Sequence, residues 1–345
     1  MKLQAPAFWW EKPGFKAWAL WPLSCLYGSI AGRRMRGTGA YRPTIPVICV
    51  GNVTLGGAGK TPTALALAEA AKAMGLIPGF LSRGYGGKIR KATRVDPSKH
   101  GADDVGDEPL LLAEQAITVV ARRRAEGARE LERQGVNLII MDDGFQSAQI
   151  RVDCAVVVTD SYKGAGNGMT FPAGPLRAPL KLQVKALDAI LVVGDGDGAT
   201  PLVRQAARMG KPVLNARLSP LPSADVPDGS LKGRAVLAYA GIADPEKFFR
   251  TVREVGAEIA IARGFGDHQA LSRQEIDDLI ATAQGRNLRL VTTAKDRARL
   301  RGSSLPAAQT LLAQSNVIDV AIRFNDPAAG QWLIRQAQER FSKTR

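Results

Sequence analysis

A glycine-rich segment ending in Lys-Thr constrains the fold of this chain more than any other feature. Residues 45–50, IPVICV, form a short β-branched apolar run that predicts a buried strand. Residues 51–62 read GNVTLGGAGKTP, and the alanine-rich residues 63–75 predict a helix. Strand, glycine loop and helix in this order place backbone N–H groups and a helix N-terminus where they bind phosphate oxygens.

This loop predicts a site for a nucleoside triphosphate. Lys60 would reach the β- and γ-phosphates, and the Thr61 hydroxyl would ligate Mg²⁺. The usual pattern has glycine where this chain has Thr54, so a glycine-rich turn without a phosphate is the alternative. The residues expected to bind the nucleotide are Thr54, Leu55, Gly56, Gly57, Ala58, Gly59, Lys60 and Thr61.

Two acidic residues follow a second apolar run. Residues 136–141, VNLIIM, predict a buried strand, and Asp142 and Asp143 come directly after it. Ligands of open parallel sheets bind at the carboxyl ends of the strands. We therefore expect one of these carboxylates to hold Mg²⁺ or its water shell, although a solvated turn would have the same sequence.

Further polar candidates stand near predicted strand ends. Asp107 and Glu108 precede a helical run, where acids fit helix capping as well as catalysis. Three arginines, 122–124, follow the predicted strand at 117–121, and at least one fits a phosphate-neutralising role while the others fit a solvated face. His268 lies in a loop between a strand and a helix, where it fits a cap, a surface residue or a catalyst.

The charge of the chain favours an anionic partner. Lys and Arg number 47 against 32 Asp and Glu, a formal net charge of +15, so nucleic acid, phospholipid headgroups and a phosphorylated substrate all remain open. Basic residues and four of the five tryptophans gather in residues 1–45. The apolar run 17–30 is shorter than the roughly 20 residues of a comfortable span, and Pro22 interrupts it. We expect a helix lying in the membrane interface, with packing on the protein's own core and a true span as alternatives.

Alternating apolar and helical segments predict an α/β architecture. Strands are expected near 45–50, 77–82, 117–121, 136–141, 153–159 and 189–193, in a mostly parallel sheet. A second α/β alternation begins near residue 232, after a segment rich in Pro, Ser and Asp. The expected division is a membrane-associating segment 1–36, a nucleotide-binding domain 37–217, a linker 218–231 and a smaller domain 232–345.

Eight motifs appear together in one order along the chain. They are GNVTLGGAGKTP (51–62), LSRGYGG (81–87), VGDEPLLLA (105–113), MDDGFQ (141–146), GNGMTFPAGPLR (166–177), YAGIADPEKFF (239–249), GDHQALS (266–272) and VTTAKDRARL (291–300). Jointly they resemble the motifs of the lipid A 4'-kinase (tetraacyldisaccharide 4'-kinase) family.

The resemblance implies a fold and an activity. It implies a P-loop kinase-like domain with a smaller C-terminal α/β domain. It also implies transfer of phosphate from ATP, with Mg²⁺, to the 4'-hydroxyl of a tetraacyldisaccharide 1-phosphate, which forms lipid IVA. The implied partners are this lipid and an anionic membrane surface, at the cytoplasmic face of the bacterial inner membrane. Peripheral or monotopic attachment, a monomer and no nucleic-acid partner are expected.

The resemblance also implies roles for single residues. Asp107 matches the acid that helps to deprotonate the hydroxyl, and His268 matches its histidine partner. Arg177 matches the arginine near the transferring phosphate, and Arg124 aligns with a further active-site arginine. Asp142 and Asp143 match the carboxylates of the metal and phosphate site. After the GPLR arginine the family often has an acid, and Ala178 stands there in this chain.

Two other classes of protein fit parts of the sequence. A membrane-recruited P-loop ATPase or GTPase switch would share the loop, but no NKxD-type guanine motif is present. A nucleic-acid-binding protein would share the positive charge, but the aromatic residues cluster with the N-terminal apolar run and no recognised nucleic-acid motif appears.

Overall fold

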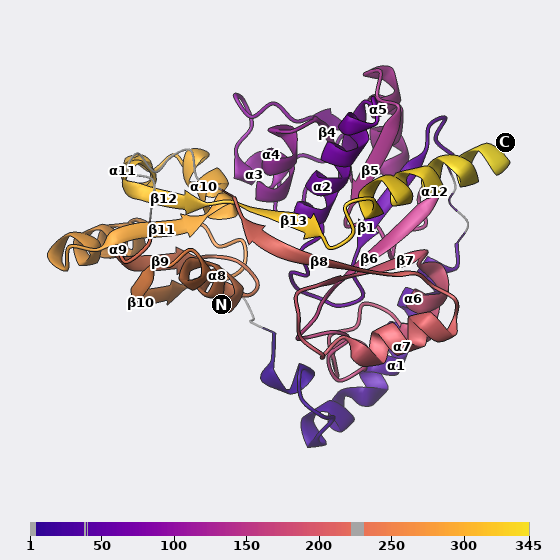
Figure 1. The fold of residues 1–345 in the computed structure, drawn as a ribbon, viewed down its shortest axis with the longest axis horizontal. Coiled ribbons are helices and arrows are strands. Elements are labelled where there is room, and N and C mark those ends of the chain that lie inside the picture. The colour runs from indigo at the N-terminus through magenta and orange to yellow at the C-terminus, as the bar shows by residue number, and fades with distance from the viewer. Residues whose placement is uncertain (1–4, 38, 40, 222–230, 345) are drawn as a thin grey trace.

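A nine-stranded, mostly parallel sheet forms the centre of the larger part of the molecule (Figure 1). The structure, a computed structural model, describes residues 5–37, 39, 41–221 and 231–344. Across the sheet the strands are β13 (Val320–Phe324), β8 (Val213–Pro220), β7 (Ala189–Val193), β6 (Cys154–Asp160), β1 (Val47–Gly51), β5 (Leu138–Asp142), β2 (Pro78–Ser82), β4 (Ile117–Val120) and β3 (Thr93–Arg94). Only the edge strands β13 and β3 pair antiparallel with their neighbours. The six predicted strands are confirmed to within a few residues.

Helices cover both faces of this sheet, which explains why its central strands are apolar throughout. One face packs against α2 (Lys60–Ala73), α4 (Asp107–Ala113) and α12 (Ala329–Lys343). The other packs against α5 (Arg124–Arg133), α6 (Leu180–Ala186) and α7 (Thr200–Arg208). Every residue of β1, β2, β5 and β6 is buried between these layers. The short helices η1 (Ala7–Trp9) and α3 (Ala102–Val105) lie outside the two layers.

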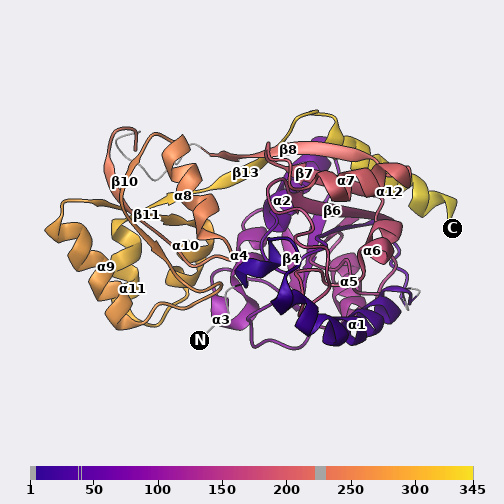
Figure 2. The same ribbon diagram turned by 90° about the horizontal axis from the view of Figure 1, so that it is seen from below.

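A smaller, fully parallel sheet lies beside the large one (Figures 1 and 2). Its strands, in order across the sheet, are β10 (Glu258–Gly264), β9 (Ala235–Ala240), β11 (Arg289–Thr293) and β12 (Ser315–Ile318). Its helices are α8 (Pro245–Glu254), α9 (Arg273–Gly285), α10 (Ala294–Arg301) and α11 (Pro306–Gln314). Helix α9 begins with a capping box, in which Ser272 and Glu275 bond each other's backbone N–H groups.

The C-terminal end of the chain differs from the predicted division. The range 232–345 was expected to form one domain, but β13 and α12 return to the large sheet. Strand β13 pairs antiparallel with β8, and α12 buries Leu333, Ile334 and Ala337 in the core that contains α2. These segments are apolar enough to pack on either sheet, so their sequence does not tell which one they join. Of the expected linker 218–231, residues 218–220 belong to β8 and residues 222–230 lie outside the described part of the chain.

The N-terminal helix α1 (Phe15–Met35) lies on the surface beside α6 (Figure 2). Its buried positions are all small: Ala17, Ser24, Gly28 and Gly32. A Cβ on Gly32 would lie 2.8 Å from Leu182, so the small residues let the helix approach the protein closely. Its large apolar side chains are exposed instead, namely Phe15, Trp18, Trp21, Leu23, Leu26 and Ile30. Among the described residues, no helix combines the length and apolar character that crossing a bilayer requires.

Candidate active site

The glycine-rich loop joins β1 to α2 and is held in an unusual backbone conformation. Gly56 and Gly59 have φ angles of +105° and +91°, a region that side chains with a Cβ rarely adopt. Gly59 is also the N-cap of α2, so the helix N-terminus points into the loop. The Lys60 ammonium is buried, lying 3.4 Å from Asn52 Oδ1 and 3.8 Å from an Asp143 carboxylate oxygen. The lysine of the predicted phosphate-binding loop therefore lies buried beside Asn52 and Asp143.

Asp142 ends β5 at the strand's carboxyl end, next to β1 in the sheet. One carboxylate oxygen accepts a hydrogen bond from Thr61 Oγ1 at 3.2 Å. The other is buried and has no hydrogen-bond partner among the described residues. Burial raises the pKa of Asp142 to about 7, and the negative charge of Glu108 adds to the effect. A buried carboxylate oxygen without a donor is a position that a cation would stabilise.

Asp143 is ionised and held by two cations. Arg177 Nη1 donates to its carboxylate at 2.7 Å, and Arg177 Nε donates to the carbonyl of Thr54 at 2.9 Å. Burial would raise the pKa of Asp143, but Lys60 and Arg177 outweigh it and lower that pKa to about 2. Asp143 itself has a φ of +54°, which is rare for a residue with a Cβ. Arg177 thus connects the loop to the end of β5.

Arg124 lies behind this turn. Its guanidinium is buried and donates to the carbonyl oxygen of Asp143 at 3.1 Å and to that of Leu81 at 3.5 Å. Burial lowers the pKa of Arg124. The contacts recorded for its side chain are to backbone oxygens, so it supports the Asp143 turn from within the protein.

Asp107 and His268, 161 residues apart, meet between the two sheets. His268 Nδ1 lies 2.9 and 3.0 Å from the two carboxylate oxygens of Asp107, which is only 2% exposed. Burial would raise the pKa of Asp107, but His268, Lys295 and Arg299 together hold it well below its usual range. Burial would lower the pKa of His268, but the hydrogen bond and charge of Asp107 raise it. Tyr85 contacts His268, with its ring 5.4 Å from the imidazole and tilted by 57°.

Two cations of α10 complete the cluster, and no role was assigned to either from the sequence. Arg299 pairs with Asp107 and donates to Asp296 at 2.5 Å and to the carbonyl of Gly241 at 2.8 Å. Lys295 pairs with Glu108 at 2.6 Å, and this contact lowers the pKa of Glu108 despite its burial. The spacing of Lys295 and Arg299 in VTTAKDRARL indicates that the two lie on one helix face. It does not show that they pair with Glu108 and Asp107.

Helix α8 of the smaller part also contacts the phosphate loop. Lys247 pairs with Asp160 at the end of β6 and lies 3.4 Å from the carbonyl oxygen of Gly57. Nearby, Lys163 and Asp244 form an ion pair of 2.6 Å. The smaller part therefore meets the larger one at the loop as well as at Asp107.

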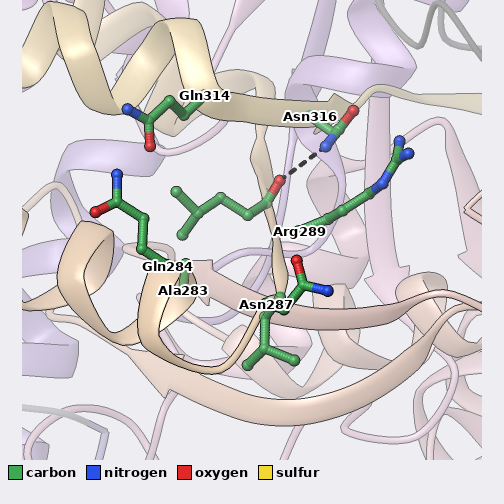
Figure 3. Close-up of a pocket in the computed structure, with 8 residues that line it drawn as sticks. Ala283, Gln284, Asn287, Arg289, Gln314 and Asn316 are labelled. Carbon is green, nitrogen blue, oxygen red and sulfur yellow. Dashed lines mark hydrogen bonds between the residues drawn. The ribbon is translucent and has the colours of Figure 1, made fainter.

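A separate cavity of about 350 Å³ lies near the ends of α9 and α11 (Figure 3). Amide side chains surround it, and Asn316 donates to the carbonyl of Leu290 at 3.1 Å. Its lining residues include Arg289 but no carboxylate, and none of them belongs to the cluster around Asp107. The cavity is not part of the site.

Comparison with known proteins identifies the family. Residues 16–338 match the family model described as tetraacyldisaccharide-1-P 4'-kinase. A tetraacyldisaccharide 4'-kinase of Allorhizobium ampelinum is 67% identical over 100% of both chains. One of Rhizobium rhizogenes is 55% identical over 98% of this chain and 93% of that protein. The crystal structure of LpxK from Aquifex aeolicus, in complex with ATP, has the same fold, with a TM-score of 0.69 and 24% identity over 93% of this chain and 99% of that one. The chain belongs to the tetraacyldisaccharide-1-phosphate 4'-kinase family.

Proposed function

We propose that this protein transfers the γ-phosphoryl group of ATP to the 4'-hydroxyl of a tetraacyldisaccharide 1-phosphate, forming lipid IVA in lipid A biosynthesis. The observation that carries the proposal is the buried Asp107–His268 pair, in which His268 Nδ1 lies 2.9 Å from the carboxylate of Asp107. Lys295 and then Lys60 lower the pKa of Glu108 against the effect of burial, and the charge of Glu108 adds to the burial that raises the pKa of Asp142. The acids of α4 and the phosphate loop therefore share one electrostatic environment. The names of the relatives support this substrate.

The residues of the loop fit a nucleotide with Mg²⁺. Magnesium bound to a nucleotide needs only one or two carboxylates from the protein, because phosphates and water supply the other ligands. Within the described residues no group of three His, Cys, Asp or Glu side chains forms a metal cage, which agrees with that mode. Thr61, Asp142 and Asp143 would hold the ion, which would neutralise charge on the β- and γ-phosphates. Lys60 and Arg177 supply further positive charge from the protein.

Asp107 would receive the proton in the transfer step. The bond between the γ-phosphorus and the bridging oxygen of ATP breaks as the 4'-oxygen forms its bond to phosphorus, and ADP leaves. The hydroxyl proton passes to the Asp107–His268 pair, and Asp107 is placed for it by the hydrogen bond to Nδ1. Packing of the smaller part against Asp107 excludes water from this position, which limits hydrolysis of ATP.

Helix α1 would place the protein on the cytoplasmic face of the inner membrane, attached peripherally or monotopically. Its exposed tryptophans suit the headgroup level of a bilayer, and Arg33 and Arg34 in its last turn suit anionic lipids. Removing residues 1–36 should abolish sedimentation with anionic vesicles, and a truncated protein that still sediments would place the attachment elsewhere.

The test of the reaction is transfer of radiolabelled γ-phosphate from ATP to the tetraacyldisaccharide 1-phosphate in detergent micelles. Asp107→Ala should lose most turnover and keep its affinity for ATP, because Asp107 acts on the acceptor. Lys60→Ala should lose both, because Lys60 contacts the nucleotide. No transfer by the wild-type protein would refute the activity, and near-wild-type turnover by Asp107→Ala would refute the role of that residue.

A further inference from the structure

Arg299 lies on α10, where the smaller part of the molecule packs against α4 (Figure 2). The preceding residue, Ala298, is buried in an apolar cluster that also contains Val105 and Leu110. The Arg299 side chain is 9% exposed. Apolar packing of the two helices therefore brings a guanidinium into the interface, next to the carboxylate of Asp107.

The guanidinium of Arg299 is itself held in place. Its Nη2 atom donates to Asp296 at 2.5 Å and to the carbonyl oxygen of Gly241 at 2.8 Å. Asp296 is anchored in turn, because it accepts hydrogen bonds from Thr293 Oγ1 at 2.6 Å and from the Gly241 N–H at 3.1 Å. The Nη1 atom of Arg299 donates to Asp107. Because a guanidinium is planar and rigid, its anchored side fixes the direction of the donor that Asp107 meets.

Gly241 also connects Arg299 to His268. The backbone N–H of His268 donates to the same carbonyl oxygen of Gly241 at 3.2 Å. His268 has a φ of +55°, a conformation that a residue with a Cβ keeps only when its surroundings support it. Its Nδ1 atom lies 2.9 Å from one carboxylate oxygen of Asp107, whose other oxygen accepts from Arg299. The contacts thus form a closed ring, from Asp107 through Arg299 and Gly241 to His268 and back to Asp107.

We propose that Arg299 is a positioning residue for the transfer step, which sets the orientation of the Asp107 carboxylate toward the His268 ring. The inference rests on the proposed function, in which this pair receives the proton of the acceptor hydroxyl. The Arg299 side chain is shielded from water and its donors are committed to protein oxygens, so it acts through the pair and not by contact with a substrate. A misplaced pair would leave both substrates bound but would slow the proton transfer.

Arg299→Lys separates the geometry of the guanidinium from its charge. The lysine keeps a cation beside Asp107, so the buried carboxylate is not left uncompensated, but an ammonium cannot reproduce the planar arrangement of donors. We expect kcat to fall about ten- to one-hundred-fold, the cost of a misplaced reacting group, while KM for ATP and KM for the acceptor stay unchanged. Arg301→Lys is the matched control on the same helix, because its side chain is 57% exposed, and it should leave kcat unchanged.

Titration of His268 by NMR is a second readout, and it does not depend on turnover. The chain has two histidines, so His268→Gln assigns the imidazole signals. Burial lowers the pKa of His268, but the contact with Asp107 outweighs it and raises that pKa. A looser contact in Arg299→Lys should therefore lower the pKa toward its usual value of about 6.5. The other groups that face the ring are unchanged in this variant. They are Lys295 of α10, Asp267 of the same loop and Tyr85 of the loop after β2.

The outcomes separate positioning from other roles of Arg299. Wild-type kcat in Arg299→Lys, or an unchanged pKa of His268, would overturn the proposal. A rise in KM at unchanged kcat would assign Arg299 to substrate binding instead. A loss of kcat that disappears when the rate is expressed per folded molecule, with the folded fraction taken from urea unfolding, would leave Arg299 only a stabilising role and contradict the inference. If the wild-type protein transfers no phosphate while the pKa of His268 falls in Arg299→Lys, the proposed function fails and the orienting contact stands, so the two failures are distinguishable.

Discussion

Replacing Arg299 by Met would remove the cation that joins Asp107 to the smaller part of the molecule. The Arg299 side chain is 9% exposed and that of Asp107 is 2% exposed, so the pair is shielded from water. Removing one member of a buried ion pair costs about 3–5 kcal/mol, because the remaining charge stays buried. His268 still contacts Asp107 at 2.9 Å, and Thr293 Oγ1 and the Gly241 N–H still donate to Asp296, the other carboxylate that Arg299 contacts. We therefore expect the lower end, about 3 kcal/mol.

Urea-induced unfolding measures this loss as a lower midpoint at unchanged slope. The matched control is Arg301→Met on the same helix, where the side chain is 57% exposed and lies 3.3 Å from Glu114. Exposed ion pairs contribute about 0–1 kcal/mol, so the control should unfold near the wild-type midpoint. The comparison separates the buried charge from any general effect of losing an arginine from α10.

A second variant tests the cause of the loss. In Arg299→Met/Asp107→Asn the amide carries no charge, so part of the lost stability should return despite the additional substitution. A loss below about 1 kcal/mol in Arg299→Met, or no recovery in the double variant, would refute the reasoning that an uncompensated buried carboxylate causes it.

Three further predictions concern His268, helix α1 and Lys247. The raised pKa of His268 contributes stability that is present below its unfolded pKa of about 6.5 and is lost as pH rises through the folded pKa. The thermal midpoint of His268→Gln should therefore lie furthest below that of the wild type at acidic pH, and the gap should close at alkaline pH. Trp18→Ser/Trp21→Ser should weaken sedimentation with vesicles about tenfold or more, because both rings are exposed apolar surface. Lys247→Met should raise KM for ATP about three- to tenfold with little change in kcat, because its ammonium lies 3.4 Å from the carbonyl of Gly57 in the phosphate loop.

The central strands could be predicted because a strand buried on both faces is a continuous apolar run. The runs at 45–50 and 136–141 therefore gave β1 and β5 within a few residues. Strand β8 was missed because its side chains are half-buried or exposed except at Ala216, so it has no such run. Its partner β13 follows the smaller sheet in the chain, and the choice between two sheets is a tertiary effect that local pattern does not contain.

Parts of the site built from residues that are close together in the sequence could be located in advance, and parts built from distant residues could not. The phosphate loop needs only glycines, a lysine and a helix start in sequence, so the loop between β1 and α2 could be located in advance, whereas its binding of a nucleotide stays a prediction. The Asp107–His268 pair spans 161 residues, and the sequence related the two only through resemblance to a family. Lys295 and Arg299 carried no signal of their own beyond their spacing, because a basic helix face is usually solvated.

The distribution of charge between the two parts has a physical consequence. Asp107 and Glu108 are adjacent acids, and burial alone would raise the pKa of both. Their counter-ions, Lys295 and Arg299, belong to α10, so both acids are ionised and buried only when α10 packs against α4. If the two parts separate, the acids gain water instead of remaining buried without partners. The packed interface is thus the state in which Asp107 is both shielded from water and charged, as its proposed role of accepting the hydroxyl proton requires.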